Sequence, residues 1–401
     1  MSLLVVLLAT ASFLSLAMVL TLHAAAHAKL PGGRARREGP TPPVSILKPL
    51  KGLDDGLYDN LAALARQDYP EYEIVFGAED PDDPALAVAR RVMEDHPDVP
   101  MTVRVSNRAI GLNPKVNNLV GLAARARFEH LLISDSNVRP DPGYLRAMTA
   151  ELADPKVGLV SSVLAGTGER TVGALMENAH LNSFVLGGVC GAEVLAERAC
   201  VIGKSMLFRR THLNLMGGWW SVRDILAEDF ILGARFQKAG FRVALSPHVL
   251  PTVNTFWSVE RFANRHVRWG QMRRWIVPFA FLGEPLLNPT PFLLAFLLAA
   301  LAVPAAIDPT VAAMLTGAGI ALKGLSDEVL AHRLRGRGYG LAGLVWIPAK
   351  DVLVAGLWVL AAVRRTVDWR GTVLWIGPGS RLDRRPPNWM DVPEPGAEVP
   401  A

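Results

Sequence analysis

The chain has 401 residues, of which 50% are hydrophobic, and its mean hydropathy is +0.24. This length suffices for one large domain plus membrane segments, and the apolar composition excludes an ordinary water-soluble enzyme. A net charge of +5 at pH 7 is compatible with nucleic-acid binding. The arginines, however, gather beside apolar segments, where they are expected to face anionic lipid headgroups, so we predict no nucleic-acid partner.

The N-terminal segment 3–22 is apolar and has about the 20 residues that a membrane-spanning helix needs. A cleaved signal peptide is the competing interpretation, but its positive charges precede the apolar run, whereas Arg34 and Arg37 follow it. We therefore predict an uncleaved transmembrane anchor over 1–28, with the N-terminus outside, and a linker over 29–43.

The stretch 44–275 alternates predicted strands with predicted helices. Val, Ile and Leu runs predict strands near 44–47, 74–76, 101–105 and 131–134, and apolar residues at helical spacing predict helices near 57–64, 84–93 and 115–126. This alternation predicts an α/β domain with a mostly parallel, doubly wound sheet. In such sheets ligands bind beyond the carboxyl ends of the strands. Asp80 and Asp135 both follow a predicted strand, so we expect both to face that crevice.

Apolar segments return after residue 276, and we assign 276–371 to C-terminal membrane segments and 372–401 to a tail. Two segments form a pair that turns at Asp308-Pro309, and a third, 341–363, is interrupted by Pro348, Lys350 and Asp351; the pair covers 288–306 and 309–325. Three full spans after a cytoplasmic domain would put the basic tail outside, against the positive-inside rule. We therefore expect one segment not to cross, and 341–363 is the candidate.

Several ordered motifs resemble those of the ceramide glucosyltransferase family, membrane enzymes of glycosyltransferase family 21 that include bacterial relatives acting on hopanoids. The matching stretches are 46–52, 79–84, 113–118, 134–139, 227–229, 265–269 and 369–371. The resemblance implies a GT-A catalytic domain, which is Rossmann-like with a mostly parallel sheet, between N-terminal and C-terminal transmembrane helices. It also implies an inverting transfer of a sugar by direct displacement.

The same resemblance implies roles for individual residues. Asp229 is expected to be the catalytic base, and Asp135 to bind the nucleotide-sugar diphosphate and a divalent metal, Mg²⁺ or Mn²⁺. The other expected nucleotide-sugar ligands are Asp80, Lys115, Arg265, Arg268 and Trp269. Chemistry supports these residue types, because a diphosphate leaving group needs cations and an acceptor hydroxyl needs a nearby carboxylate.

Each of these residues also has a simpler interpretation. Asp135 would cap a turn, and Asp229 would be an acid favoured at a helix N-terminus. Asp80 and Lys115 would be solvated surface residues. Trp269 would anchor the chain at the membrane interface. The ordered co-occurrence of the motifs favours the functional interpretation.

Two features of the sequence leave alternatives for the metal ligands and for the tryptophan box. The wider superfamily usually has a carboxylate two residues after Asp135, but here Asn137 stands there, and an amide is a weaker ligand for a hard cation. Two tryptophan boxes also compete: 271–275 fits processive polysaccharide synthases, whereas 265–269 fits the lipid enzymes, and its spacing from Asp229 favours it.

The sequence therefore predicts a hexosyltransferase that moves glucose or N-acetylglucosamine from a UDP-sugar to the hydroxyl of a membrane lipid, either ceramide or a hopanoid polyol. We expect a multi-pass protein of the bacterial inner membrane with its catalytic domain in the cytoplasm. A processive polysaccharide synthase and a non-catalytic membrane protein that binds nucleotide or lipid are the alternatives.

Overall fold

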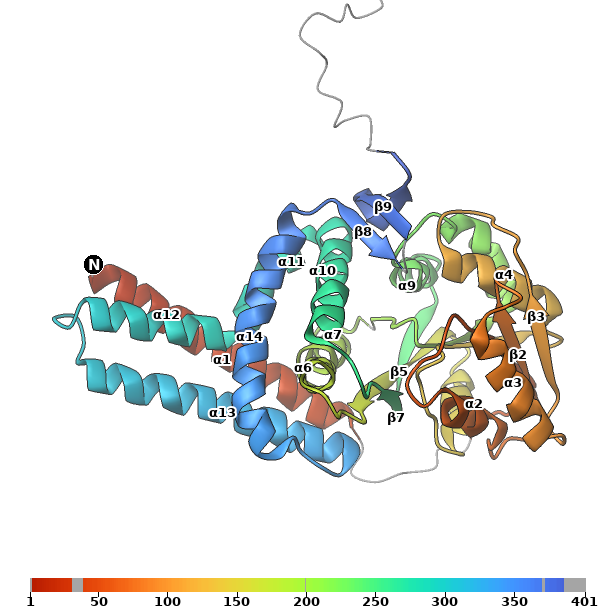
Figure 1. Cartoon of the computed structure of the whole chain (residues 1–401), viewed down its shortest axis with the longest axis horizontal. Coiled ribbons are helices and arrows are strands. Elements are labelled where there is room, and N and C mark those ends of the chain that lie inside the picture. Colours follow the sequence, from red (N-terminus) through yellow and green to blue (C-terminus); the bar gives the residue numbers. More distant parts are fainter. Residues whose placement is uncertain (1, 31–38, 199, 370–371, 386–401) are drawn as a thin grey trace, which may run out of the picture.

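A computed structural model describes residues 2–30, 39–198, 200–369 and 372–385. Most of the predicted linker and the end of the predicted tail, residues 31–38 and 386–401, lie outside these residues, as do 370 and 371 of one matching motif. Figure 1 shows an α/β domain at one end of the molecule and a group of long helices at the other.

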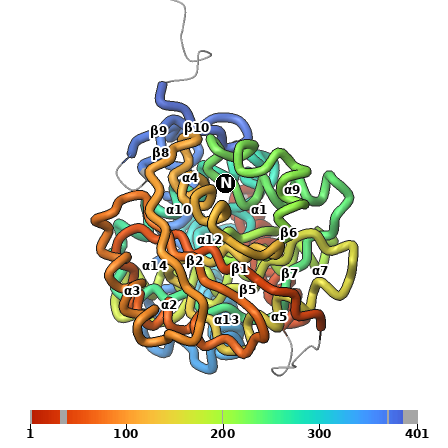
Figure 2. Tube along the Cα trace, turned by 90° about the vertical axis from the view of Figure 1, so that its right-hand side faces the viewer, coloured from red at the N-terminus to blue at the C-terminus, as the bar shows by residue number. Residues whose placement is uncertain are grey.

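The α/β domain contains a seven-stranded mixed sheet in the order β3-β2-β1-β4-β6-β5-β7. Its strands are β1 (Val44–Pro49), β2 (Tyr72–Ala78), β3 (Met101–Val105), β4 (His130–Ser134), β5 (Val157–Thr167), β6 (Ser205–Arg209) and β7 (Arg242–Val253). All neighbours pair in parallel except β6, which runs antiparallel to β4 and β5. The predicted parallel sheet is confirmed, and Figure 2 shows β1 and β2 side by side within it.

Helices cover both faces of the sheet, and their starts follow local sequence signals. Asp83 accepts a hydrogen bond from the backbone of Ala85, and Asn113 accepts one from Val116, each just before a proline at the first helical position. These helices are α2 (Leu57–Ala65), α3 (Pro84–Asp95), α4 (Pro114–Arg125), α5 (Tyr144–Ala150), η1 (Glu151–Ala153), α8 (Arg210–Leu215), η3 (Trp219–Val222) and α9 (Glu228–Lys238).

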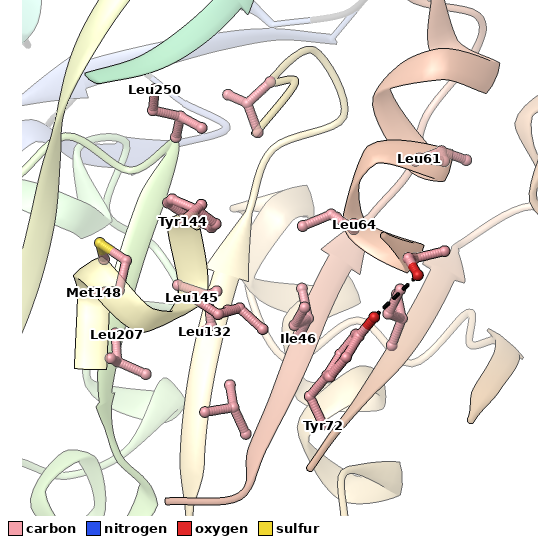
Figure 3. Packing of buried hydrophobic residues seen from close by; sticks show 14 of the residues in the cluster. Ile46, Leu61, Leu64, Tyr72, Leu132, Tyr144, Leu145, Met148, Leu207 and Leu250 are labelled. Atoms are coloured by element: carbon pink, nitrogen blue, oxygen red, sulfur yellow. Dashed lines mark hydrogen bonds between the residues drawn. The ribbon is translucent and has the colours of Figure 1, made fainter. Parts of the chain in front are cut away.

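One face of the sheet packs on α2, α3 and α5 in a core of fully buried side chains. Figure 3 shows Ile46 and Leu132 from neighbouring strands facing Leu64 and Tyr144 from these helices. Tyr72 Oη donates to the carbonyl of Ala65 at 3.1 Å, which ties the start of β2 to the end of α2. This packing fixes where the strand ends, and hence the site residues, lie.

Three long helices extend side by side away from the α/β domain, and a fourth runs across them (Figure 1). The three are α1 (Ser2–Lys29), α12 (Pro289–Ala302) and α13 (Pro309–Arg335), and the fourth is α14 (Gly340–Val363). Asp308 caps α13, as the predicted turn requires. Helix α13 continues ten residues beyond the predicted end at 325.

The expectation of an interrupted segment at 341–363 is wrong, because α14 is one helix with Pro348 inside it. Its charged residues Lys350 and Asp351 are buried against other helices and do not break it. Within the described residues, α14 is apolar and long enough to cross a membrane, as are 3–29 and 172–196. Figure 1 shows α14 running across α1, and whether 341–363 crosses a membrane stays a prediction.

The α/β domain also contains an apolar helical stretch that the sequence did not separate from the rest of 44–275. It consists of α6 (Val172–His180), a π-helical turn η2 (Leu181–Val185) and α7 (Leu186–Ala196). Helix α7 packs against α1, and α6 packs against α10 (Val259–Ile276). The interval 44–275 is therefore not uniformly soluble in character. A bent pair follows α10, in which α11 (Pro278–Gly283) and η4 (Glu284–Leu287) meet α12 at 58°.

The predicted boundary between membrane segments and tail at 372 runs through a folded unit. An antiparallel sheet forms from β8 (Thr366–Trp369), β9 (Thr372–Gly377) and β10 (Arg381–Asp383), with η5 (Pro378–Ser380) between the last two. Val367, Leu374 and Ile376 pack with Leu226 of the α/β domain in one cluster. Residues 372–383 are therefore part of the fold, because their alternating apolar side chains pack against the α/β domain.

Candidate active site

A cleft of about 1210 Å³ opens where β1, β2 and β4 end. The seven residues singled out from the sequence all line it: Asp80, Lys115, Asp135, Asp229, Arg265, Arg268 and Trp269. The strand ends supply one wall, α9 supplies Asp229, and α10 with β8 supplies the opposite wall. The structure thus brings together residues from distant parts of the sequence, the first of which is Asp80 and the last Trp269.

Asp135 follows β4 and lies among lysines. Its Oδ1 is 3.0 Å from Lys115 Nζ, and its Oδ2 is 3.8 Å from Lys204 Nζ. Burial disfavours the charged carboxylate, but the two lysines outweigh burial and lower the pKa of Asp135 to about 2. Lys48 Nζ donates to the Asp135 carbonyl from the opposite side. Asp135 is therefore a fixed anion within a cationic pocket and not a turn cap alone.

Two of these lysines, Lys48 and Lys204, were missed by sequence reasoning. Lys204 Nζ donates to Asn137 Oδ1 at 2.6 Å, and burial lowers the pKa of Lys204 to about 8. Burial likewise lowers the pKa of Lys48 to about 7. A lysine inside the apolar run of β1 was a usable signal for Lys48, whereas nothing in the sequence around Lys204 distinguishes it.

Asp229 stands at the N-terminus of α9, where backbone amides hold its carboxylate. Gly203 N–H donates to Oδ2 at 2.6 Å, and Phe230 N–H donates to Oδ1 at 2.8 Å. Burial raises the pKa of Asp229. Burial, together with the neighbouring charge of Asp229, also raises the pKa of Glu228 to about 7. A carboxylate with a raised pKa facing a cleft is suited to take a proton from a hydroxyl group.

The α10 wall presents Arg265 between two tryptophan rings, 5.1 Å from the ring centre of Trp257 and 4.3 Å from that of Trp269. Behind it, the fully buried carboxylate of Glu177 lies 3.1 Å from Arg265 Nη1 and 2.9 Å from His266 Nε2. Glu177 comes from α6, inside the apolar stretch 172–196, for which the sequence predicted no site residue. Trp269 is therefore part of the cleft wall.

The two competing tryptophan boxes occupy different environments. Arg265, Arg268 and Trp269 line the cleft. In the second box, Gln271 also reaches the cleft but donates to the carbonyls of Arg364 and Thr366, and Arg273 pairs with Glu284. The second box therefore holds α10 to its neighbours, which favours 265–269 as the functional box.

The two remaining residues differ in exposure. Asp80 is exposed at the cleft rim, where it accepts the backbone N–H of Asp82 at 2.9 Å. Lys115 is not a solvated surface lysine, because its ammonium also donates to the Gly203 carbonyl at 2.9 Å and lies 3.3 Å from Glu228. Its several acidic neighbours outweigh burial and raise the pKa of Lys115.

The cleft residues could hold a divalent metal ion only together with the phosphates of a nucleotide sugar. No group of three or more His, Cys, Asp or Glu side chains arranged to hold a metal exists in the part of the chain that the structure describes. Asp135 supplies one carboxylate, while the amide oxygen of Asn137 is taken by Lys204. Mg²⁺ is commonly held by one or two carboxylates plus substrate phosphates and water, and that arrangement suits this site.

Known proteins show similarity along most of the chain. Residues 4–382 match the model of glycosyl transferase family 21. Ceramide glucosyltransferase 3 of Caenorhabditis elegans is 28% identical over 66% of this chain and 58% of its own length. Ceramide glucosyltransferase of Pyricularia oryzae is 24% identical over 89% of this chain and 87% of its own length. The chain thus spans less than two thirds of the nematode relative.

The fold also has a solved counterpart. A mannosyltransferase from Pyrobaculum calidifontis, solved in complex with GDP-Man and Mn²⁺, superposes with a TM-score of 0.56 at 21% identity, covering 89% of this chain and 98% of that one. This likeness supports the GT-A fold expected from the mixed sheet. With the family match over nearly the whole length, the chain belongs to glycosyl transferase family 21.

Proposed function

We propose that this protein is an inverting hexosyltransferase that moves glucose or N-acetylglucosamine from a UDP-sugar to a hydroxyl of a membrane lipid, ceramide or a hopanoid polyol. The observation that carries the proposal is the shared cleft, in which the Asp229 carboxylate faces a wall of cations. The ceramide glucosyltransferase names of the relatives support the choice of a lipid acceptor.

In the proposed reaction the acceptor oxygen attacks the anomeric carbon as the bond from that carbon to the diphosphate oxygen breaks. The hydroxyl proton passes to Asp229, and the bonding electrons leave with UDP. Lys115, Lys204 and Arg265 neutralise the charge that develops on the leaving diphosphate. Direct displacement from the opposite side inverts the anomeric centre.

A divalent cation, Mg²⁺ or Mn²⁺, is part of the proposal. Asp135 would hold it together with the donor phosphates, and the ion would supply further charge neutralisation at the diphosphate. The chain's own contribution is to keep Asp135 ionised and oriented, which Lys115 and Lys204 do. Asp80 at the cleft rim would contact the nucleoside part of the donor.

The proposed setting is the bacterial inner membrane, with the α/β domain in the cytoplasm. Helix α1 would cross with the N-terminus outside, α12 and α13 would cross as a pair, and α14 would lie across them at the cytoplasmic side. Arg333 and Arg335 at the end of α13 and Arg364 and Arg365 after α14 would then all be cytoplasmic, in agreement with the positive-inside rule.

The test is transfer by the full chain in lipid nanodiscs. UDP-glucose and UDP-N-acetylglucosamine are supplied separately with Mg²⁺ or Mn²⁺, and ceramide and a hopanoid polyol are the separate acceptors. Mass spectrometry should show one added sugar on one lipid, and NMR of that product should show the inverted anomer. A long polymer would indicate a processive polysaccharide synthase, and UDP binding without product would indicate a non-catalytic membrane protein.

A further inference from the structure

A second cavity, of about 270 Å³, lies on the opposite side of α10 from the donor cleft. Helices α1, α10, α12 and α14 and the turn η2 surround it. His266 and Gly270 of α10 line this cavity, whereas Arg265 and Trp269 of the same helix line the cleft. At Gly270 an added Cβ would lie 2.6 Å from Ala361 Cβ, so α10 and α14 touch closely there. The cavity is therefore separate from the site already described.

The walls of this cavity are largely apolar and reach the outer surface of the helices. Leu22, Phe184, Phe292, Leu357 and Trp358 form much of the lining. Val359, another lining residue, is 54% exposed on α14, next to the exposed Leu360. In the proposed membrane setting, this opening faces hydrocarbon, which gives a lipid chain a lateral way in.

Two uncharged, buried polar atoms of lining residues lack a hydrogen-bond partner, while the buried Lys323 ammonium has ion pairs. His180 Nε2 and Asn288 Oδ1 are both inaccessible to solvent, and no described residue forms a hydrogen bond with either. Asn288 is otherwise held in place, since its Nδ2 donates to the Asp351 carbonyl at 2.7 Å. A buried acceptor without a donor costs free energy, so a ligand that supplies the donor would be favoured.

A hydroxyl group matches both atoms, because it donates to an amide oxygen and either donates to or accepts from a histidine ring nitrogen. The charged groups of the lining are mutually paired, Lys323 with Asp351 at 2.8 Å and Arg273 with Glu284, so they do not demand a charged ligand. The volume is below the roughly 300–1,000 Å³ of pockets that enclose drug-sized ligands. This size suits one hydrocarbon chain better than a lipid with two chains.

We propose that this cavity is a second lipid site, distinct from the donor cleft, that binds one hydrocarbon chain bearing a hydroxyl group. It lies behind the functional box: His180 stacks edge-on against His266 with ring centres 4.3 Å apart, and His266 contacts Glu177, which in turn holds Arg265. The inference rests on the proposed function for its membrane setting but not for its chemistry.

The test is photolabelling of the full chain in nanodiscs with hexadecanol that carries a diazirine near the hydroxyl. Mapping by mass spectrometry should place label on peptides that contain His180, Phe184, Asn288 or Phe292. Val354 lines the cavity, and Val352 on the same helix is 47% exposed and does not. Val354→Phe should lower this labelling about tenfold, and the matched Val352→Phe should leave it unchanged. Equal labelling in both variants would overturn the proposal.

A second arm tests the hydroxyl. Asn288→Ala should lower labelling by the alcohol about tenfold but not labelling by the same probe without its hydroxyl group. An equal effect on both probes, with unchanged thermal unfolding, would remove Asn288 from hydroxyl recognition and overturn the assigned ligand class. Labelling needs no sugar transfer, so labelling with no glycolipid product would refute the proposed function and leave this site standing.

Discussion

Helix α10 divides two regions that both bury charged side chains, and the regions differ in whether those charges line an open cleft or pair with one another. On the cleft side, the ammonium groups of Lys48, Lys115 and Lys204 surround Asp135. On the membrane side, Lys323 and Lys350 pair with Asp327 and Asp351 at 2.6–2.8 Å, two cations with two anions. Glu228 and Asp229 also lie near Lys115, and this first cluster lines the open cleft. The second cluster is neutral by itself.

This difference separates a binding site from a structural device. A self-neutral buried cluster needs no ligand, and its members come from α13 and α14, so it fixes how these helices meet. Lysines that line an open cleft can bind an anion that arrives there, and a nucleotide diphosphate provides one. Substitutions in the two clusters should therefore fail in different ways.

The largest effect is expected from Asp229→Asn, which removes the base and keeps the shape. Transfer should fall by about 10²–10⁴-fold, the usual contribution of general base catalysis. The amide oxygen can still accept one of the two backbone hydrogen bonds from Gly203 and Phe230. Initial rates of glycolipid formation measure the loss.

The control for Asp229→Asn is donor binding by titration calorimetry, which should change less than about threefold, since the cations opposite remain. Transfer at more than a tenth of the wild-type rate would show that another group removes the proton. Loss of UDP-sugar binding together with transfer would instead indicate that Asp229 holds the donor.

Asp351→Asn tests the neutral cluster. Its carboxylate contacts Lys323 and Lys350, each at 2.8 Å, and accepts a hydrogen bond from Thr290 Oγ1. Removing the charge leaves two buried ammonium groups with Asp327, and breaking a buried pair typically costs about 3–5 kcal/mol. Thermal unfolding in nanodiscs should show a clearly lower midpoint.

A matched substitution separates this effect from a general one. Asp98→Asn makes the same chemical change at an exposed position and should alter stability by no more than about 0.5 kcal/mol. If Asp351→Asn unfolds at the wild-type temperature while losing donor binding, the contrast between the two clusters is wrong.

Lys204→Met tests the lysines of the cleft, where we expect the larger effect on UDP binding and the smaller one on folding stability. The variant removes one of three lysines around Asp135 and leaves Lys48 and Lys115 in place, so folding stability should fall by less than in Asp351→Asn. UDP affinity should fall about 10–100-fold, because a hydrogen bond to a charged group contributes roughly 1.5–3 kcal/mol. Calorimetric titration with UDP measures it, and unchanged affinity would exclude Lys204 from the diphosphate site.

Sequence reasoning located residues that belong to recognisable motifs or follow predicted strands, and it missed buried residues that only distant partners bring to the site. Asp80 and Asp135 follow strands, and a strand end is visible as the point where an apolar run stops. Glu177 and Lys204 contribute to the same cleft, but they lie within buried segments, and their partners are 88 and 67 residues away. Only tertiary packing reveals such contacts.

The membrane region shows the same limit from another side. Composition identifies α1 and α14 as apolar helices of spanning length, but it carries no information on direction. The buried ion pairs fix how α13 packs against α14. From the sequence, members of this cluster such as Lys350 were interpreted as interruptions of a membrane span. A charged side chain is costly where a helix faces lipid, but it is tolerated inside a helix bundle when an oppositely charged side chain pairs with it.

The smallest expected effect concerns Glu228, which accompanies Asp229 in the cleft. Its pKa is raised to about 7, mainly by burial, so Glu228 is mostly protonated below neutral pH and ionised above it. Ionisation puts a second negative charge beside Asp229 and strengthens that residue's attraction for a proton. Because a stronger base removes the hydroxyl proton more readily, kcat/KM should rise a few-fold between about pH 6 and pH 8.

Glu228→Gln resembles the protonated form at every pH, so the rise in kcat/KM near neutral pH should disappear. The fall in kcat/KM at acid pH should remain, because there Asp229 itself takes a proton. The pH at which kcat/KM falls should be higher than for an ordinary aspartate, since burial raises the pKa of Asp229. Glu260→Gln, the same change at an exposed position of the cleft, should keep both features. A rise near pH 7 that persists in Glu228→Gln would assign it to another group and would leave Glu228 with a structural role beside Lys115 and Asn113, which it contacts at 3.3 Å.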